Sequence, residues 1–194
     1  RWRMSNKKVP MLNRHIRALS ERLVQGEPLT HNMLSWAKQH VEWSLAEGDY
    51  TAHDGVLMLV IDVNGNAAMT VGEYEPLADT SAKALRARSA EARSEADETG
   101  VAPELLAAVN DGGLAFVAPA DECLCGTATL IEQLAQTKGI PVTRVDIPAQ
   151  LKGALFLVSD EHGVVPATAT DAAEADAATV AFFADGYEKL RARR

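Results

Sequence analysis

Apolar residues recur at helical spacing in five stretches of the chain, and short continuous apolar runs lie between them. The helical spacing predicts helices over residues 12–26, 30–47, 81–99, 127–138 and about 172–193, with a short helix near Ala149. The short runs predict strands over residues 56–61, 67–71, 105–109, 114–118, 142–145, 154–158 and 164–167. Together these elements predict a fold of the α/β (α+β) class.

The elements fall into two groups along the chain. Residues 75–80 contain Pro76 and show no periodicity, which is typical of a linker. We therefore predict a small N-terminal α/β domain over residues 1–75, a linker over 76–80 and a larger C-terminal mixed-sheet domain over 81–194. In the first group Asn64-Gly65 predicts a hairpin turn, and the spacing of Trp36 and Trp43 on one helix predicts packing in a core.

Composition and charge exclude several classes of protein. The chain has 194 residues, of which 47% are hydrophobic, enough for a substantial core. Lys and Arg number 19 against 27 Asp and Glu, and the net charge of -8 argues against a nucleic-acid partner. No apolar run has membrane-spanning length, and the two cysteines, Cys123 and Cys125, suit a reducing compartment. We expect a cytoplasmic protein with no membrane partner.

Two loops carry the strongest chemical signal. Leu124–Thr129 opens an apolar helix, and Leu155–Pro166 runs from a strand through a glycine turn. A helix start presents unpaired N–H groups and a partial positive charge, and hydroxyls at a nearby strand end add donors. If the two loops converge, they form a cup for an anion such as a phosphate group.

Five segments, in this order along the chain, resemble motifs of the class IV aminotransferases, the fold-type IV pyridoxal-phosphate (PLP) enzymes. That family includes branched-chain and D-amino acid aminotransferases and aminodeoxychorismate lyase. The segments are Val9–Leu19, Glu95–Gly100, Leu106–Gly113, Leu124–Thr127 with Gly139–Val142, and Leu155–Pro166. In the last segment, Phe156-Leu157-Val158-Ser159-Asp160-Glu161-His162-Gly163-Val164 resembles the family pattern F-L-x-(N/S)-S-x-x-G-V.

The resemblance implies a two-domain fold-type IV aminotransferase-like architecture, PLP as cofactor, a homodimer and a small-molecule substrate. The implied function is that of a PLP-dependent aminotransferase or aminodeoxychorismate-lyase-like enzyme acting on a small amino acid or amino-acid-like compound. Lys83 would form the Schiff base. The residues that would hold the cofactor are Arg17, Gly126, Thr127, Ser159 and Asp160. We expect no metal, because the cysteines and histidines lack metal-ligand spacing.

Three departures from the family pattern favour a second interpretation. Ala18 stands where the family has a phosphate-contacting arginine, and Thr129 stands where an arginine follows the Gly-Thr helix start. Between Gly113 and Cys125 the chain is too short for the segment that brings a glutamate to the pyridine nitrogen.

The second interpretation is a PLP-free derivative of the fold. It would serve as a binding or assembly protein, or use Cys125 and His162 for different chemistry. On this interpretation Lys83 is a solvated helix lysine among several arginines.

Overall fold

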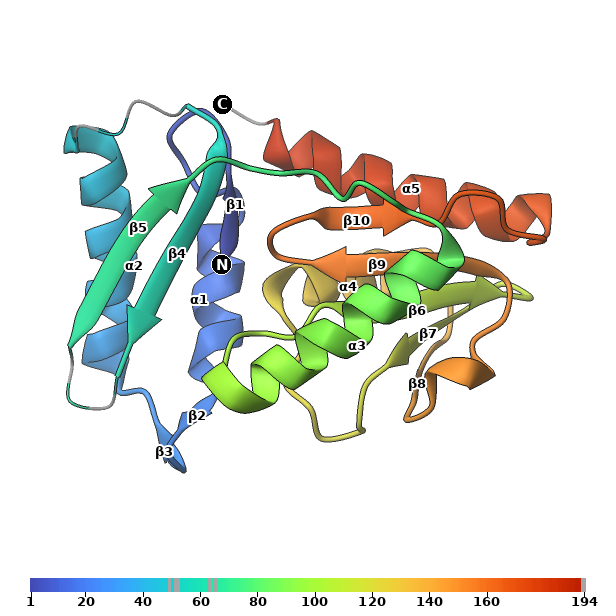
Figure 1. Cartoon of the computed structure of the whole chain (residues 1–194), viewed down its shortest axis with the longest axis horizontal. Helices are drawn as coiled ribbons and strands as arrows, with labels where there is room; N and C mark the ends of the chain where they lie inside the picture. Colours follow the sequence, from blue (N-terminus) through green and yellow to red (C-terminus); the bar gives the residue numbers. More distant parts are fainter. Residues whose placement is uncertain (49, 51–52, 63, 65, 193–194) are drawn as a thin grey trace.

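The computed structural model covers the whole chain and describes every residue except 49, 51–52, 63, 65 and 193–194. The helices are α1 (Leu12–Ser20), α2 (His31–Glu47), α3 (Ala82–Thr99), α4 (Gly126–Thr137), the short 3₁₀ helix η1 (Pro148–Gln150) and α5 (Glu174–Arg191). The strands are β1 (Trp2–Met4), β2 (Leu23–Val24), β3 (Glu27–Pro28), β4 (Gly55–Ile61), β5 (Ala67–Gly72), β6 (Leu105–Asn110), β7 (Gly113–Val117), β8 (Val142–Val145), β9 (Ala154–Ser159) and β10 (Gly163–Pro166). The predicted mixed α/β class is confirmed (Figure 1).

A five-stranded mixed sheet organises the larger half of the molecule. Its strand order is β10-β9-β6-β7-β8, with β7 and β8 parallel and the other pairs antiparallel. The central strands β6 and β9 are almost entirely buried, because helices cover both faces of the sheet. That double cover explains why both strands have continuous apolar sequences rather than alternating ones.

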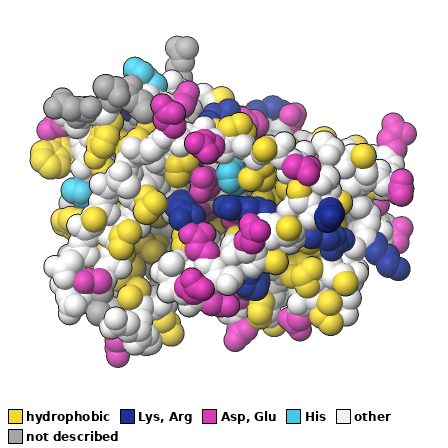
Figure 2. All heavy atoms as spheres, viewed as in Figure 1, with side chains coloured by type: hydrophobic (Ala, Val, Ile, Leu, Met, Phe, Trp, Pro, Cys, Tyr) yellow, Lys and Arg dark blue, Asp and Glu magenta, His cyan; other side chains and the backbone are white. Residues whose placement is uncertain are grey.

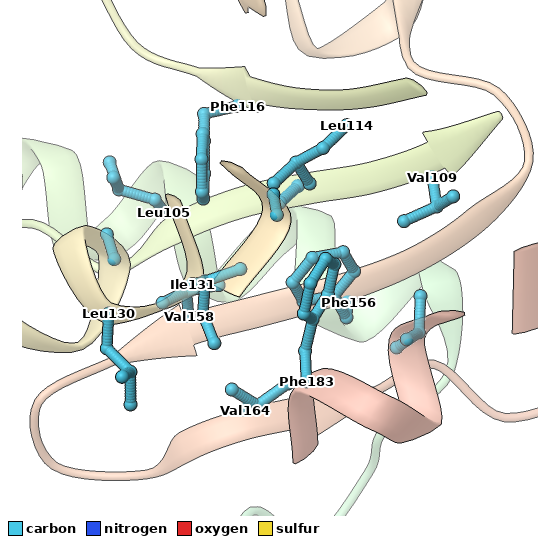
Figure 3. Close-up of a cluster of buried hydrophobic side chains, with 14 of the residues drawn as sticks. Leu105, Val109, Leu114, Phe116, Leu130, Ile131, Phe156, Val158, Val164 and Phe183 are labelled. Carbon is cyan, nitrogen blue, oxygen red and sulfur yellow. The ribbon is translucent and has the colours of Figure 1, made fainter. Parts of the chain in front are cut away.

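Alternate residues of the central strands point into two separate cores. One face, including Leu105, Val109 and Phe156, packs against α4 and α5. Figure 3 shows Phe156 of β9 beside Phe183 of α5, with ring centroids 6.2 Å apart. The other face, including Leu106 and Leu157, packs beneath α3, which crosses in front of the sheet in Figure 1. The five-stranded half is therefore a three-layer structure.

A three-stranded antiparallel sheet, β1-β4-β5, forms the smaller half, with α1 and α2 against one face. Helix α1 packs against α2 and also against α4 of the larger half. The prediction that Trp36 and Trp43 lie in the core is wrong, because they are 42% and 62% exposed. The buried face of α2 is formed instead by Leu34, Ala37, Val41 and Leu45. The spacing of the two tryptophans therefore indicated the wrong face of the helix.

The first predicted helix is too long. Helix α1 ends at Ser20, and the next residues form the hairpin β2–β3, whose two-residue turn is Gln25-Gly26. Both turn residues have positive φ, which is the conformation that matches the twist of a tight hairpin. Leu23, which continues the helical spacing in the sequence, is 65% exposed on this hairpin.

Residues 73–80 connect the two halves without helix or strand. The division at residues 76–80 into two folding domains stays a prediction. Gly65 of the expected hairpin turn and Arg193 at the expected end of the last helix lie outside the described residues. None of the described helices has the length and apolar character needed to cross a membrane.

Candidate functional site

The end of β9 and the start of α4 lie together, as the sequence predicts. Asp160, directly after β9, accepts hydrogen bonds from the first two backbone N–H groups of α4. The Gly126 N–H lies 3.2 Å from Oδ2, and the Thr127 N–H lies 2.7 Å from Oδ1. These N–H groups lack partners within the helix, and the helix dipole places positive charge there. The two loops form an anion cup, and the anion in it is the chain's own carboxylate.

The surroundings of Asp160 keep it ionised. Its side chain is 6% exposed, and burial alone raises the pKa of a carboxyl group. The neighbouring His15 and the hydrogen bonds from Thr127 act in the opposite direction and prevail, so the pKa of Asp160 lies well below its usual value. The carboxylate is therefore a permanent negative charge in the cup near neutral pH.

His15 of α1 completes the cup. Its Nδ1 lies 3.2 Å from Asp160 Oδ2, the distance of an ion pair, although the direction is poor for a hydrogen bond. The imidazole stacks on Trp2 with centroids 5.4 Å apart. On its other side it touches Gly126 so closely that a Cβ there would overlap Nδ1. The glycine is thus required by the approach of His15.

A small chamber opens beside the cup. Its volume is about 110 Å³, and its walls include His15, Ala18, Cys125, Ser159 and Asp160. It continues outward into a cleft of about 770 Å³ between β4 and the C-terminal end of α3, lined partly by Leu59 and Ile61. Figure 2 shows acidic and basic side chains gathered at the centre of this face, between β4 and α3.

A buried polar network lies next to the chamber. Glu104, at the start of β6, accepts two hydrogen bonds from Arg88 of α3, at 2.8 and 2.9 Å. His162 Nε2 is 3.7 Å from Glu104 Oε1, and His162 Nδ1 is 3.4 Å from the Tyr74 hydroxyl. The Arg3 guanidinium lies 3.3 Å from the centroid of the Tyr74 ring. Burial lowers the pKa of His162. The network ties α3, β1 and the β9–β10 turn together.

No family model and no curated protein matches the sequence. Solved structures do match. A fold IV transaminase from Curtobacterium pusillum superimposes with a TM-score of 0.60 at 18% identity, covering 99% of this chain and 84% of the other. A branched-chain amino acid aminotransferase from Thermobaculum terrenum, in its PLP form, gives 0.59 at 17% identity, covering 99% and 84%. A candidate aminodeoxychorismate lyase gives 0.59 at 16% identity, covering 93% and 86%.

The chain has the fold of the fold-type IV aminotransferases. The agreement extends over nearly the whole chain, so the predicted architecture is confirmed for both halves. At these identities the similarity establishes the fold, and the chemistry has to be argued from the residues of the site.

Within this fold, Lys83 lies far from the cup. It is the second residue of α3, it is exposed, and it is not among the residues lining the chamber or the outer cleft. The chamber is lined by the opposite part of α3, from Ala92 to Glu95. Lys83 and Ala92 are nine positions apart in the helix, about 14 Å along its axis. The structure therefore does not bring Lys83 to the predicted phosphate site.

The other predicted cofactor residues divide into two groups. Gly126, Thr127, Ser159 and Asp160 come together, whereas Arg17 points to solvent and its neighbour Ala18 lines the chamber. The hydroxyl oxygen of Ser159 accepts hydrogen bonds from the N–H groups of Glu161 and His162, both at 3.0 Å. Ser159 thus stabilises the turn after β9.

The geometry gives no support to a Cys125 and His162 pair. Burial raises the pKa of the Cys125 thiol, and the negative charge of Asp160 raises it further. A thiol with a raised pKa is a poor nucleophile. His162 contacts Tyr74 and Glu104 and is not among the chamber-lining residues, whereas Cys125 is. Cys125 is a small buried residue at the start of α4.

The residues present do not fit PLP. The two N–H groups that would receive a phosphate already bind Asp160, and a second anion there would meet that carboxylate. Ala18 offers no charge, and Lys83 is outside the cleft. The chamber volume of about 110 Å³ is also below the range of about 300–1,000 Å³ typical of small-molecule pockets, so only the outer cleft is large enough.

Sequence reasoning missed the pairing of His15 with Asp160 and the stacking of Trp2 on His15. A signal was present for Asp160, since it stands where the family pattern quoted above has a serine. Replacing a neutral hydroxyl by a carboxylate changes the charge of the cup. His15 lies in the Val9–Leu19 segment that resembles a family motif, but its pairing with Asp160 has no sequence signal, because the two residues are more than a hundred positions apart.

Proposed function

We propose that this chain is a cofactor-independent derivative of the fold-type IV fold that binds a small molecule in the cleft between β4 and α3. The proposal rests on one observation: the Asp160 carboxylate accepts hydrogen bonds from the Gly126 and Thr127 N–H groups. An internal anion that is covalently part of the chain is present at very high effective concentration. A free phosphate group has to displace it to enter the cup.

The cleft supports a binding role. It combines an apolar wall, which includes Leu19, Leu59 and Ile61, with charged side chains from α3 and the turn after β9. Its outer part of about 770 Å³ has the size of ordinary ligand pockets. A concave, partly apolar surface with a few polar groups is the usual form of a small-molecule site.

The competing function is a PLP-dependent aminotransferase or aminodeoxychorismate-lyase-like enzyme. It is favoured by the fold and by the two helix N–H groups, which would bind a phosphate if Asp160 moved away. In that case the Asp160 carboxylate would have to move away from His15 and from the two N–H groups, so that the phosphate could take its place.

A PLP titration separates the two functions. Purified protein is incubated with PLP, its near-visible absorbance is followed, and the sample is then reduced with borohydride and digested for mass spectrometry. We expect no saturable absorbance band and no lysine labelled in preference to the others. The Lys83→Ala variant and a Lys152→Ala control, which removes another exposed lysine, should behave like the wild type.

A saturable band that disappears in Lys83→Ala and persists in Lys152→Ala would establish the PLP enzyme and overturn the proposal. Preferential borohydride labelling of any other single lysine would overturn it equally.

A further inference from the structure

We propose that the chamber beside the cup binds the hydroxyl group of a small uncharged compound, an alcohol or phenol with an apolar body. The hydroxyl group would hydrogen-bond to Nε2 of His15, and the apolar body would lie against β4. This inference rests on the proposed cofactor-independent binding function and names its ligand class.

The first argument is that one ring nitrogen of His15 has no partner in the protein. Nδ1 faces Asp160, and Gly126 lies against the same edge of the ring. Among the described residues, no group hydrogen-bonds to Nε2, and of the two ring nitrogens only Nδ1 is fully enclosed. Because the side chain is only 2% exposed and lines the chamber, we place Nε2 at the chamber wall. A buried polar atom of this kind costs free energy until a ligand or water satisfies it.

The second argument is that the His15 ring is held in one orientation. Trp2 stacks on it with the ring planes 17° apart, and the close approach of Gly126 limits movement of the Nδ1 edge. A hydrogen atom on Nδ1 is favoured because the ionised Asp160 carboxylate lies beside it, and this tautomer leaves a lone pair on Nε2. Nε2 is therefore a fixed acceptor, and a hydroxyl group is a donor that brings no charge.

The third argument is that charged side chains around the chamber are already paired, which argues against a charged ligand. Arg1 pairs with Glu95, with the closest contact at 2.6 Å, and Arg88 donates two hydrogen bonds to Glu104. An ammonium or carboxylate group in the chamber would lose its hydration and would have to compete with one of these pairs.

The remaining charges of the chamber wall are also compensated or solvated. The Asp160 carboxylate is bound by the cup, and the amino group of Arg1 is close enough to be attracted by both Asp160 and Glu161. Glu161 is only partly buried, so water reaches its side chain. Arg22 donates to a backbone carbonyl at 3.3 Å. The polar atom that the chamber leaves for a ligand is therefore Nε2 of His15.

The rest of the chamber wall is apolar and defines the body of the ligand. Trp2, Ala18 and Ala92 line the chamber alone, whereas Leu59 and Ile61 line both the chamber and the outer cleft. The chamber volume of about 110 Å³ has room for a hydroxyl group and a few carbon atoms. A larger apolar body has to continue into the outer cleft, between β4 and the end of α3.

Three probes with the same benzyl body test this assignment. They are benzyl alcohol, benzyl methyl ether, which lacks the O–H donor, and benzylamine, which carries a charge. Each is titrated into ¹⁵N-labelled protein, and dissociation constants are obtained from NMR shifts, with the Trp2 indole as the reporter in the chamber. We expect benzyl alcohol to bind about three- to tenfold more tightly than either of the other two, because it alone satisfies Nε2 without bringing a charge.

Two variants locate the hydrogen bond. His15→Phe keeps an aromatic ring beside Trp2 and removes Nε2, so its affinities for benzyl alcohol and benzyl methyl ether should agree within about twofold. His31→Phe makes the same change at an exposed position of α2 and should keep the wild-type preference for the alcohol. The wild-type Nε2 resonance provides a test that needs no variant, since benzyl alcohol should shift it more than the ether does.

Equal affinities of the alcohol and the ether in the wild type, or tighter binding of benzylamine, would overturn the ligand class. Failure of benzyl alcohol to shift the Trp2 indole would do the same. A preference for the alcohol that persists in His15→Phe would overturn the role of His15. These results are separate from the PLP titration, because a chamber with no preference for the alcohol can still lack a Schiff-base lysine. A PLP band that depends on Lys83 would instead overturn the proposed function itself.

Discussion

Asp160 connects four elements through one residue. It follows β9, its carboxylate binds the start of α4 and faces His15 of α1, and its carbonyl accepts a hydrogen bond from the Arg3 N–H of β1 at 2.8 Å. Asp160 therefore holds these four elements together. Its charge also determines which anions the cup can accept.

We predict that Asp160→Ala destabilises the protein by about 2–5 kcal/mol, because it leaves two backbone N–H groups buried without their acceptor, each at a cost of about 1–3 kcal/mol. Urea unfolding followed by circular dichroism measures the change. Asp185→Ala removes an exposed aspartate of α5 and should change stability by less than about 0.5 kcal/mol. Equal unfolding midpoints for the two variants would contradict the role assigned to Asp160.

The stabilisation by Asp160 should depend on pH. Its pKa is lowered in the folded protein, so its contribution is present above the unfolded-state value of about 3.9 and is lost as pH falls through the folded value. The difference in unfolding free energy between wild type and Asp160→Asn should therefore shrink as pH falls below about 4. A difference that stays constant down to about pH 2 would show that Asp160 is not the group concerned.

Gly126→Ala tests the approach of His15 to the helix start. The added Cβ would overlap His15 Nδ1, and the imidazole, held against Trp2, has to move away from Asp160. We expect a loss of about 1–3 kcal/mol in thermal or urea unfolding. Gly72→Ala is the matched control, because an added Cβ there has no neighbour within 4 Å. A comparable loss of stability in Gly72→Ala would show that the loss in Gly126→Ala does not come from the overlap with His15.

For single residues, the sequence predicted part of the cup. Gly126, Thr127, Ser159 and Asp160 were predictable because helix starts and strand ends have local signatures. Lys83 and Arg17 were placed by resemblance, and the distance along α3 and the rotation along α1 take them away from the chamber. His15 facing Asp160 depends on tertiary packing, which no local pattern records.

Among the elements, the strands with the clearest patterns were predicted best. The buried runs of β6 and β9 and the Ser81 start of α3 follow from local sequence, and Ser81 does cap the helix by accepting from the Ala84 N–H. The end of α1 was missed because Leu23 fits helical spacing while Gln25-Gly26 imposes a turn. β1 was missed because three residues carry too little pattern.

Helix α3 depends on a buried ion pair for its attachment to the sheet. Arg88 binds Glu104, whose side chain is only 9% exposed. Arg88→Ala leaves that carboxylate buried without its partner, and we expect a loss of about 3–5 kcal/mol in urea unfolding. Arg17→Ala, at an exposed arginine of α1, should change stability by less than about 0.5 kcal/mol. A small effect of Arg88→Ala would show that Glu104 is stabilised by other groups.

For the whole molecule, the fold of an aminotransferase is combined with a cup that already contains an anion. The cleft beside the cup is the place that we propose for a ligand. The homodimer implied by the resemblance stays a prediction. Light scattering of the purified chain should give twice the chain mass, and a value equal to one chain would contradict it.

The central claim is that Asp160 occupies the place of a phosphate group, and the response of thermal stability to inorganic phosphate tests it most directly. Wild type and Asp160→Ser are melted in phosphate and in chloride of equal ionic strength. We predict no saturable rise in the wild-type melting temperature and a saturable rise in Asp160→Ser, whose free N–H groups can receive the ion. A saturable rise in the wild type would contradict the account, whether or not the variant folds.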